Sequence, residues 1–182
     1  MVNQSLKAGA KMCFSFFVYI FCPNGERRGY IYFCTMSEMK IIIRTAETKD
    51  SVRLASLSAQ LGYPVDSKKM DGRLEKILKH PDNIVLVACE ADCCVGWIQL
   101  SFNLRVESEP FAEITGLVVD EGMRSRGVGK LLVEEAERRT KEKGISKIRV
   151  RSNVIRNEAH RFYLNLGYTV EKEQKVFGKT FL

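Results

Sequence analysis

A short strand, a polar turn and a glycine-rich helix start follow one another over residues 116–130, and this succession constrains the fold more than any other feature. Gly127 and Gly129 open the helix, and because glycine has no Cβ, a ligand can approach the backbone closely there. Free N–H groups at a helix start, with the helix dipole behind them, form an anion site. Three residues add positive charge around it: Arg124, Arg126 and Lys130. The segment therefore suits a phosphate or pyrophosphate.

Two common nucleotide-binding patterns do not fit this segment. The Walker pattern GxxxxGK[ST] fails because Leu131 follows Gly129 and Lys130, and because Arg124 stands where the first glycine is needed. The dinucleotide pattern GxGxxG fails because Leu132 stands at the third glycine position. The pattern that remains is R-x-x-G-x-G, which by itself also fits a purely structural helix start.

The elements around this segment are predicted from apolar periodicity and turn residues. Strands are expected at 41–44, 84–89, 94–102, 111–119, 147–151, 168–170 and 175–181. Helices are expected to begin at Asp50 and at Asp66 or Ser67, and to cover 131–143 and 158–166. The order is β-α-α-β-β-β-α-β-α-β-β, in which the third helix makes a right-handed crossover between parallel strands. This order predicts an α/β (α+β) fold, with a mixed, mostly antiparallel sheet of six to seven strands and helices on both faces.

Composition excludes several other classes of protein. The chain has 182 residues, of which 28% are charged and 45% hydrophobic, so collagen, coiled coil and wholesale disorder are excluded. No apolar run of the sequence approaches the length of a bilayer span, which excludes a polytopic membrane protein. The six cysteines include no CxxC pair and only two histidines accompany them, so we expect no metal site. We expect reduced thiols in a cytoplasmic protein.

The formal net charge of +7 is consistent with an anionic partner, which would be a nucleic acid, a membrane surface or a phosphorylated small molecule. Taken alone, the charge favours the simpler interpretation, a solvated basic surface. No recognised nucleic-acid motif is present, and the positive residues of 124–130 are better used on a pyrophosphate. We therefore expect neither nucleic acid nor membrane as a partner.

Residues 1–38 differ from the rest of the chain and hold three of the six cysteines. Their apolar stretch 12–22 imitates a signal peptide, but it is too short for a membrane span and no small-residue cleavage site follows it. We expect Met39 to be the true start of the protein, with 1–38 an artefact of start assignment and 39–182 the functional domain. The alternative is a hairpin that pairs 12–22 with 29–35 and adds to a sheet edge.

A second motif stands downstream of the glycines. The segment Asn157–Tyr168 reads NEAHRFYLNLGY and contains the pattern A-x-x-x-Y-x-x-x-G-[FY]. At this spacing, the two motifs resemble the GNAT superfamily of N-acetyltransferases, and the resemblance covers 39–182, including the strand order. It implies acetyl-CoA as co-substrate, no metal, and direct transfer of the acetyl group to a primary amine. The acceptor would be a small molecule or a peptide, and the resemblance allows a homodimer.

The resemblance also implies where the cofactor lies. The pantetheine arm would occupy a gap between the fourth and fifth strands and bond to the backbone of Leu117 and Val119, as an added strand would. The pyrophosphate would bind to N–H groups of the following loop. Family members often carry an asparagine where this chain has Arg156, so either Asn157 or Arg156 would take that contact. The implied cofactor-binding residues are Leu117, Val119, Arg124, Ser125, Arg126, Gly127, Val128, Gly129, Lys130 and Asn157.

Two residues carry the implied chemistry. Tyr163 would protonate the departing thiolate, and Glu113 would accept the proton of the amine, directly or through water. The alternatives are a tyrosine that only packs its helix on the sheet and a glutamate that faces solvent. Strand alternation places Glu113, Thr115 and Leu117 on one face unless Gly116 marks a bulge.

Acceptor specificity is expected in the first two helices and in the loop 103–110. Glu107 and Glu109 of that loop could attract a cationic amine, or could simply be solvated. A different class of function also fits the motifs, because the domain could bind acyl-CoA without turnover, as a sensor or an interaction module.

Overall fold

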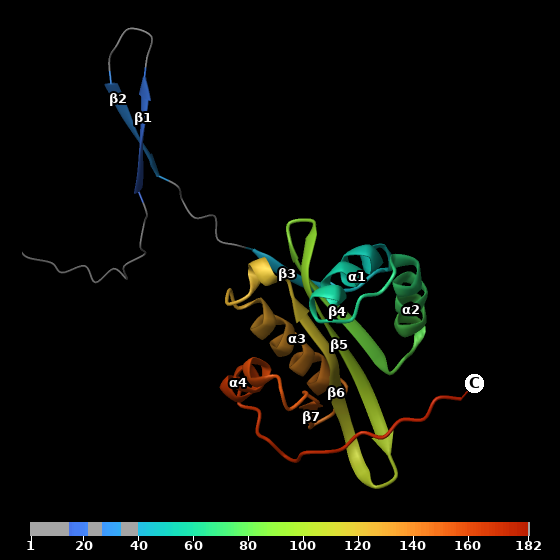
Figure 1. The fold of residues 1–182 in the computed structure, drawn as a ribbon. Helices are drawn as coiled ribbons and strands as arrows, with labels where there is room; N and C mark the ends of the chain where they lie inside the picture. Colours follow the sequence, from blue (N-terminus) through green and yellow to red (C-terminus); the bar gives the residue numbers. More distant parts are fainter. Residues whose placement is uncertain (1–14, 22–26, 34–39, 182) are drawn as a thin grey trace, which may run out of the picture. The chain divides into compact units, whose positions relative to one another are not determined.

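The structure is a computed structural model that describes residues 15–21, 27–33 and 40–181 (Figure 1). It divides into two units, Met1–Met39 and Lys40–Leu182, which we describe separately. In the first unit, β1 (Ser15–Phe21) and β2 (Arg27–Phe33) pair antiparallel over their full length. The hairpin expected for 12–22 and 29–35 lies partly outside the described residues, and the status of Met39 as the start stays a prediction.

The second unit contains a five-stranded sheet in the order β3-β4-β5-β6-β7. Neighbouring strands are antiparallel except for β6 and β7, which are parallel, so the predicted mixed and mostly antiparallel sheet is confirmed. The strands are β3 (Ile41–Thr45), β4 (Asn83–Glu90), β5 (Cys93–Arg105), β6 (Ser108–Val119) and β7 (Ile148–Val150). The helices are α1 (Ser51–Gln60), α2 (Ser67–Lys79), α3 (Val128–Glu142) and α4 (Asn157–Asn165), with 3-10 turns η1 (Thr48–Asp50) and η2 (Glu121–Met123).

The prediction of six to seven strands in this sheet is wrong, because the sheet has five. The segments 168–170 and 175–181 are extended chain without strand pairing. Strand-forming residues make a strand only when a neighbour supplies hydrogen bonds and a surface to pack on. Here Val176, Phe177 and Phe181 are 85%, 89% and 81% exposed, so the closing segment has β-type residues but no packed face.

Helices cover both faces of the sheet, as the alternation of buried residues requires. On one face, Leu54 and Leu57 of α1 and Leu74 of α2 pack with Val85 and Val87 of β4 in one buried cluster. Helix α2 begins where expected, because the Asp66 carboxylate caps it by accepting hydrogen bonds from two backbone N–H groups at 3.0 and 3.3 Å.

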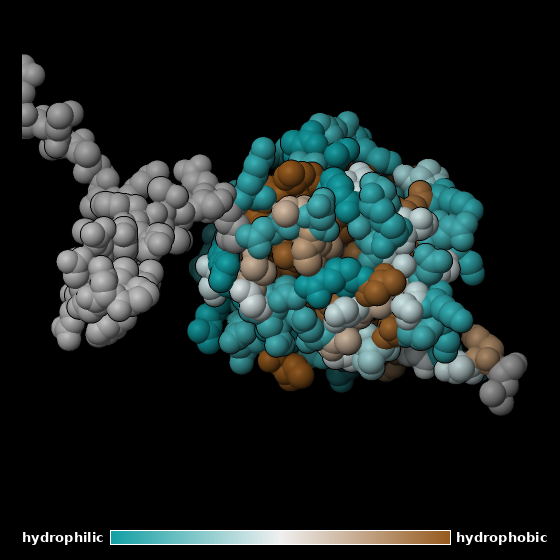
Figure 2. All heavy atoms as spheres, turned by 90° about the horizontal axis from the view of Figure 1, so that it is seen from above, coloured by the Kyte–Doolittle hydropathy of each residue, from teal (hydrophilic) through white to brown (hydrophobic). Residues whose placement is uncertain are grey.

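The opposite face of the sheet packs against α3, which contacts strands β3 to β6. Its buried side chains are Val128, Leu132, Val133, Ala136 and Thr140. Seen from above, the surface of the second unit is mostly hydrophilic, with apolar side chains scattered among polar ones (Figure 2). None of the described helices is long and apolar enough to cross a membrane.

Candidate active site

A bulge in β6 decides which side chains share a face. Gly116 pairs with Gln99 and Ile114 pairs with Leu100, so Thr115 between them is an extra residue without a partner on β5. One extra residue reverses the alternation of a strand. The side chains of Glu113 and Leu117 therefore lie on opposite faces of the sheet. The two would share one face only in a strand without a bulge.

Gly116 has a steric role beside this bulge. A Cβ at this position would lie 2.7 Å from two carbons of the Trp97 ring, which crosses directly over the glycine. Val118, two residues further on, belongs to the cluster packed under α1 and α2. Glu113 thus lies on the α1–α2 face and Leu117 on the α3 face.

The bulge also turns the backbone of the strand end outward. The N–H of Asp120 donates to the carbonyl of Val95 on β5 at 2.9 Å. Alternation from Asp120 therefore directs the backbone groups of Leu117 and Val119 away from β5. β7 pairs with β6 only as far as Ile114, so beyond it no described strand takes up the edge that Leu117 and Val119 present. This is the geometry of a strand edge that is open to an added strand.

The turn after β6 holds two residues in the left-handed backbone region. Ser125 has φ 61° and Gly127 has φ 82°. Gly127 is the N-cap of α3 and supplies no side-chain cap, so the first N–H groups of the helix have no acceptor within it. The open strand edge and this uncapped helix start follow one another directly in the chain.

The positive side chains of this turn differ in their contacts. The Arg124 Nε donates to the carbonyl of Val119 at 3.3 Å, and its Nη2 lies 3.6 Å from Glu121. The Arg126 Nη1 lies 3.8 Å from the Met123 sulfur. Lys130 instead points along α3, with its ammonium 3.7 Å from Glu134.

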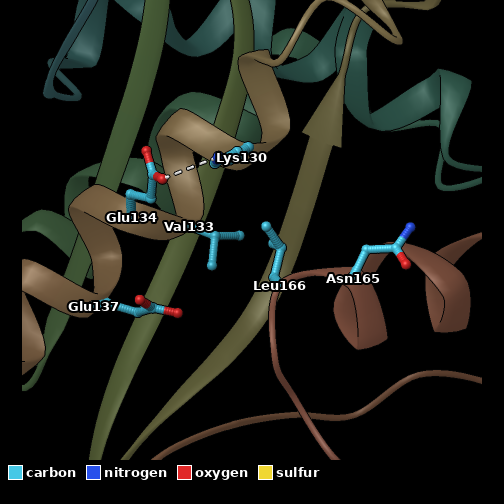
Figure 3. Close-up of a pocket in the computed structure, with 6 residues that line it drawn as sticks. All are labelled: Lys130, Val133, Glu134, Glu137, Asn165 and Leu166. Carbon is cyan, nitrogen blue, oxygen red and sulfur yellow. Dashed lines mark ion pairs between the residues drawn. The ribbon is translucent and has the colours of Figure 1, made fainter.

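Lys130 and Glu134 line a pocket of about 210 Å³ between α3 and the end of α4 (Figure 3). In the same close-up, the Leu166 side chain points toward Val133 of α3, whereas the Asn165 side chain points away from α3. Gly129 makes the approach of the two helices feasible, because a Cβ there would be 3.3 Å from the Phe162 ring. Gly129 therefore serves helix packing, whereas Gly127 serves the backbone conformation.

Contacts from α1 hold the turn, and no local sequence pattern predicts them. The Arg53 Nη2 lies 2.5 Å from the Asp120 carboxylate, and the Arg53 Nε donates to the carbonyl of Cys94 at 2.7 Å. The Gln60 side chain accepts from the N–H of Glu121 at 3.1 Å. The hydrogen bond from Arg53 lowers the pKa of the Asp120 carboxyl. The Asp120 side chain is therefore ionised at neutral pH, and its ion pair with Arg53 is intact there.

Tyr163 lies half-buried on α4 among aromatic rings. The centroid of its ring is 5.1 Å from that of Phe162 and 5.5 Å from that of Tyr168, both in edge-on geometry. Burial raises the pKa of Tyr163 to about 12, so its hydroxyl keeps its proton at neutral pH. The Tyr168 hydroxyl donates to Glu137 on α3 at 3.0 Å, which ties the end of α4 to α3.

Glu113 is buried and does not face solvent. Arg151, directly after β7, contacts its carboxylate with two atoms, Nε at 2.9 Å and Nη2 at 3.2 Å. The Arg149 Nε lies 3.7 Å from the same carboxylate. Arg149 and Arg151 were predicted only as strand residues. Their spacing of two on a strand parallel to β6 is the signal that would have placed them with Glu113.

The two candidates near the start of α4 separate in the structure. Asn157 is exposed, and no described residue takes a hydrogen bond from its side chain. Arg156 is the N-cap of α4 and donates to the carbonyl of Leu61 at 3.4 Å, so it is turned toward the end of α1.

A groove of about 980 Å³ runs along β7, between α4 and the chain that follows it. Tyr163 lines this groove together with Arg149 and Arg151. Within the described part of the chain, no group of His, Cys, Asp or Glu side chains could hold a metal ion.

Comparison with known proteins adds a family to this geometry. Residues 52–168 match the model of the Acetyltransferase (GNAT) family. Over 75 residues, the chain is 35% identical to the aminoalkylphosphonate N-acetyltransferase of Salmonella typhimurium, and the match covers 41% of this chain. It covers 49% of that protein, so the chain spans about half the length of this curated relative.

Two solved structures share the fold. A transcriptional regulator from Bacillus halodurans superposes with a TM-score of 0.70 at 25% identity, over 77% of this chain and 100% of that one. The aminoglycoside N-acetyltransferase AAC(6')-Iy, solved in complex with CoA, gives a TM-score of 0.69 at 20% identity, over 78% and 95%. The second likeness shows the fold alone.

Proposed function

Because the chain belongs to the Acetyltransferase (GNAT) family, we propose that it transfers an acetyl group from acetyl-CoA to a primary amine. The observation that carries the proposal is that two backbone segments with available hydrogen-bonding groups follow one another in the chain. One is the edge of β6 at Leu117 and Val119, which pairs with no described strand although Arg124 Nε reaches the Val119 carbonyl, and the other is the uncapped start of α3 at Gly127. An extended amide-containing arm that ends in a pyrophosphate is the ligand that fits both.

The binding roles follow from the groups available at each place. The backbone of Leu117 and Val119 offers hydrogen bonds to the amides of a pantetheine arm. The loop and helix start from Ser125 to Gly129 offer N–H groups and the positive helix end to the pyrophosphate. Arg124 and Arg126 add positive charge at this turn.

The chemistry needs a neutral amine, a donor to the thioester oxygen and a proton for the leaving sulfur. In this proposal, the amine nitrogen attacks the carbonyl carbon, the new C–N bond forms and the C–S bond breaks. An N–H of Leu117 or Val119 donates to the oxygen on which charge develops. Glu113 takes the proton of the amine, directly or through water, and Tyr163 donates a proton to the thiolate. The Tyr163 hydroxyl is protonated at neutral pH and so has a proton to give, although its burial, which raises its pKa to about 12, makes it a weaker acid than a solvated tyrosine.

The acceptor belongs to the amines, and a small molecule is the form that the relatives support. The Salmonella relative is named for an aminoalkylphosphonate, and a structural neighbour of 22% identity was solved with the aminoglycoside sisomicin. We extend to this chain only what these acceptors share, which is an amino group on a small polar molecule.

Calorimetric titration of acetyl-CoA into the purified chain tests the cofactor site. We expect micromolar binding in the unaltered chain and none in Gly127→Glu, which places a carboxylate and a strained side chain at the anion site. Gly144→Glu is the matched control, because Gly144 also has a positive φ (73°) and lies just past the other end of α3. Thermal unfolding of both variants shows whether each is folded.

Two results would contradict the proposal. Equal binding by Gly127→Glu and the unaltered chain would remove α3 from the site. Binding without acetyl transfer to any amine would instead favour the acyl-CoA-binding sensor or interaction module.

A further inference from the structure

A cluster of three arginines lies beside Phe111 and Glu113 on the α1–α2 face of the sheet. We call it the arginine patch; its members are Arg105, Arg149 and Arg151. Arg105 comes from the end of β5, Arg149 lies on β7 and Arg151 directly follows β7. All three line the groove that Tyr163 also lines.

Arg149 is held in place but lacks hydrogen-bond acceptors. Its guanidinium carbon lies 3.3 Å from the centroid of the Phe111 ring, a stacked geometry. Its Nε is buried without a hydrogen bond, because the carboxylate of Glu113 is 3.7 Å away. No described residue accepts a hydrogen bond from its Nη atoms either. A buried donor without an acceptor is costly, and such a group in a native protein calls for an explanation.

The nearby carboxylates do not supply the acceptor that the Arg149 guanidinium lacks. The carboxylate of Glu113 is gripped by Arg151 through both of its oxygens. Arg105 lies 5.1 Å above the Phe111 ring, and its nearest carboxylate is that of the exposed Glu107 at 3.7 Å. Three guanidinium groups therefore share one buried and one exposed carboxylate. The patch itself keeps an excess of positive charge. Three other carboxylates line the groove: Glu171 pairs with Lys147, Glu137 accepts from Tyr168, and Glu173 is exposed.

A stacked guanidinium with open Nη atoms is suited to bind an oxyanion. Its planar fork matches two oxygens of a phosphate-like group, and stacking on an aromatic ring fixes its direction in advance. Arg105 over the same ring adds a second positive group. Glu107 of the loop, by contrast, is an ion-pair partner of Arg105 and so does not stand free to attract a cationic amine.

We propose that the arginine patch is an anion subsite for the acceptor, so that the substrate is an amine that also carries a phosphate-like oxyanion. This inference rests on the proposed function and specifies its acceptor. The oxyanion binds to Arg149, with Arg105 beside it, and the amine extends along the groove toward the reacting centre. Polycationic amines are poor acceptors, because the same patch repels them.

Three small amines separate the charge classes: phosphoethanolamine, ethanolamine and 1,2-diaminoethane. They are compared as acceptors with the full chain at one acetyl-CoA concentration, by release of the CoA thiol. We expect kcat/KM for phosphoethanolamine to exceed that for the other two by at least about tenfold, the effect of one charged hydrogen bond. In Arg149→Gln, the ratio of phosphoethanolamine to ethanolamine falls by about tenfold or more. Arg73→Gln, an exposed arginine of α2, leaves that ratio unchanged.

A binding measurement keeps the subsite separate from turnover. Phosphoethanolamine is titrated by calorimetry into the chain saturated with CoA, and into Arg149→Gln and Arg149→Lys. We expect binding in the unaltered chain, loss in the glutamine variant and partial recovery in the lysine variant. A purely structural role of Arg149 on Phe111 would lower thermal stability but would leave this binding unchanged, and that result overturns the inference.

The outcomes distinguish the inference from the function on which it rests. Transfer to ethanolamine or diaminoethane that equals transfer to phosphoethanolamine overturns the anion subsite and leaves the acetyltransferase proposal standing. Binding of phosphoethanolamine that depends on Arg149, without transfer to any amine, supports the subsite and overturns the catalytic proposal. Absence of both transfer and binding overturns both.

Discussion

Tyr163 shows at the scale of one residue how burial and chemistry are linked. Its ring packs against Phe162 and Tyr168, and this burial raises its pKa to about 12. Tyr163 could act as a proton donor or could only pack α4 in place. Both roles need the ring in the same position, so the contacts of the ring do not distinguish them. Removing only the hydroxyl does.

Tyr163→Phe keeps the ring and removes the proton. We expect kcat to fall by about 10²-fold, the usual contribution of a general acid, while the affinity for acetyl-CoA stays unchanged. Steady-state kinetics and calorimetry measure the two quantities. Tyr63→Phe, which alters an exposed tyrosine, is the control. Unchanged kcat in Tyr163→Phe would leave the residue with packing alone.

The same variant makes a pH prediction for stability. The unfolded tyrosine loses its proton near pH 10, whereas the folded one holds it to about pH 12. The unfolded state therefore binds fewer protons above pH 10, and the free energy of unfolding falls as the pH rises through this window. Chemical denaturation at pH 8 to 11 should show a steeper fall in the unaltered chain than in Tyr163→Phe.

At the scale of elements, α1 sets the position of the turn that follows β6. Arg53 joins this turn to the carbonyl of Cys94, and Gln60 holds the N–H of Glu121. The turn carries the side chains and backbone proposed for the pyrophosphate. We therefore expect α1 to act on the proposed cofactor site without lining it, with Arg53 as a positioning residue.

Arg53→Met tests this positioning role. We expect KM for acetyl-CoA to rise by about tenfold, since a charged hydrogen bond of this kind is worth about 1.5–3 kcal/mol, while kcat changes little. Asp120→Asn should have a similar effect, and the double variant should be no worse than the larger single effect, because both remove one contact. Arg73→Gln serves as the control. Additive effects in the double variant would show that the two residues act separately.

At the scale of the whole molecule, the cofactor and catalytic residues proposed here all belong to the unit Lys40–Leu182. The first unit forms a hairpin sheet of its own. We therefore expect a chain that starts at Met39 to bind acetyl-CoA and to unfold at the same temperature as the full chain. Calorimetry and thermal unfolding of both chains measure this. A weaker or less stable short chain would assign residues 1–38 a part in the molecule, and a mass measurement on the natively expressed protein would show where it begins.

Local patterns were sufficient for the family and for most of the elements. R-x-x-G-x-G and the aromatic motif of α4 are contiguous, and the GNAT resemblance that they indicated is confirmed by the family match over 52–168. Helix starts such as Asp66, and the antiparallel run β3 to β6, follow from capping and turn residues near in sequence. Such features depend on interactions within a few residues, which is why they could be predicted.

Only the tertiary structure decided the features that depend on pairing between distant residues. The bulge at Thr115 exists because β5 and β6 pair on both sides of it, and it alone decides that Glu113 faces α1 and α2. The closing segments have strand-type residues but found no paired neighbour, so the sheet has five strands. The arginine patch likewise arises where β7 lies parallel to β6, which brings Arg149 over a phenylalanine far from it in sequence. Sequence periodicity determines which residues lie on the buried face of an element. The register between strands determines which of these residues contact one another.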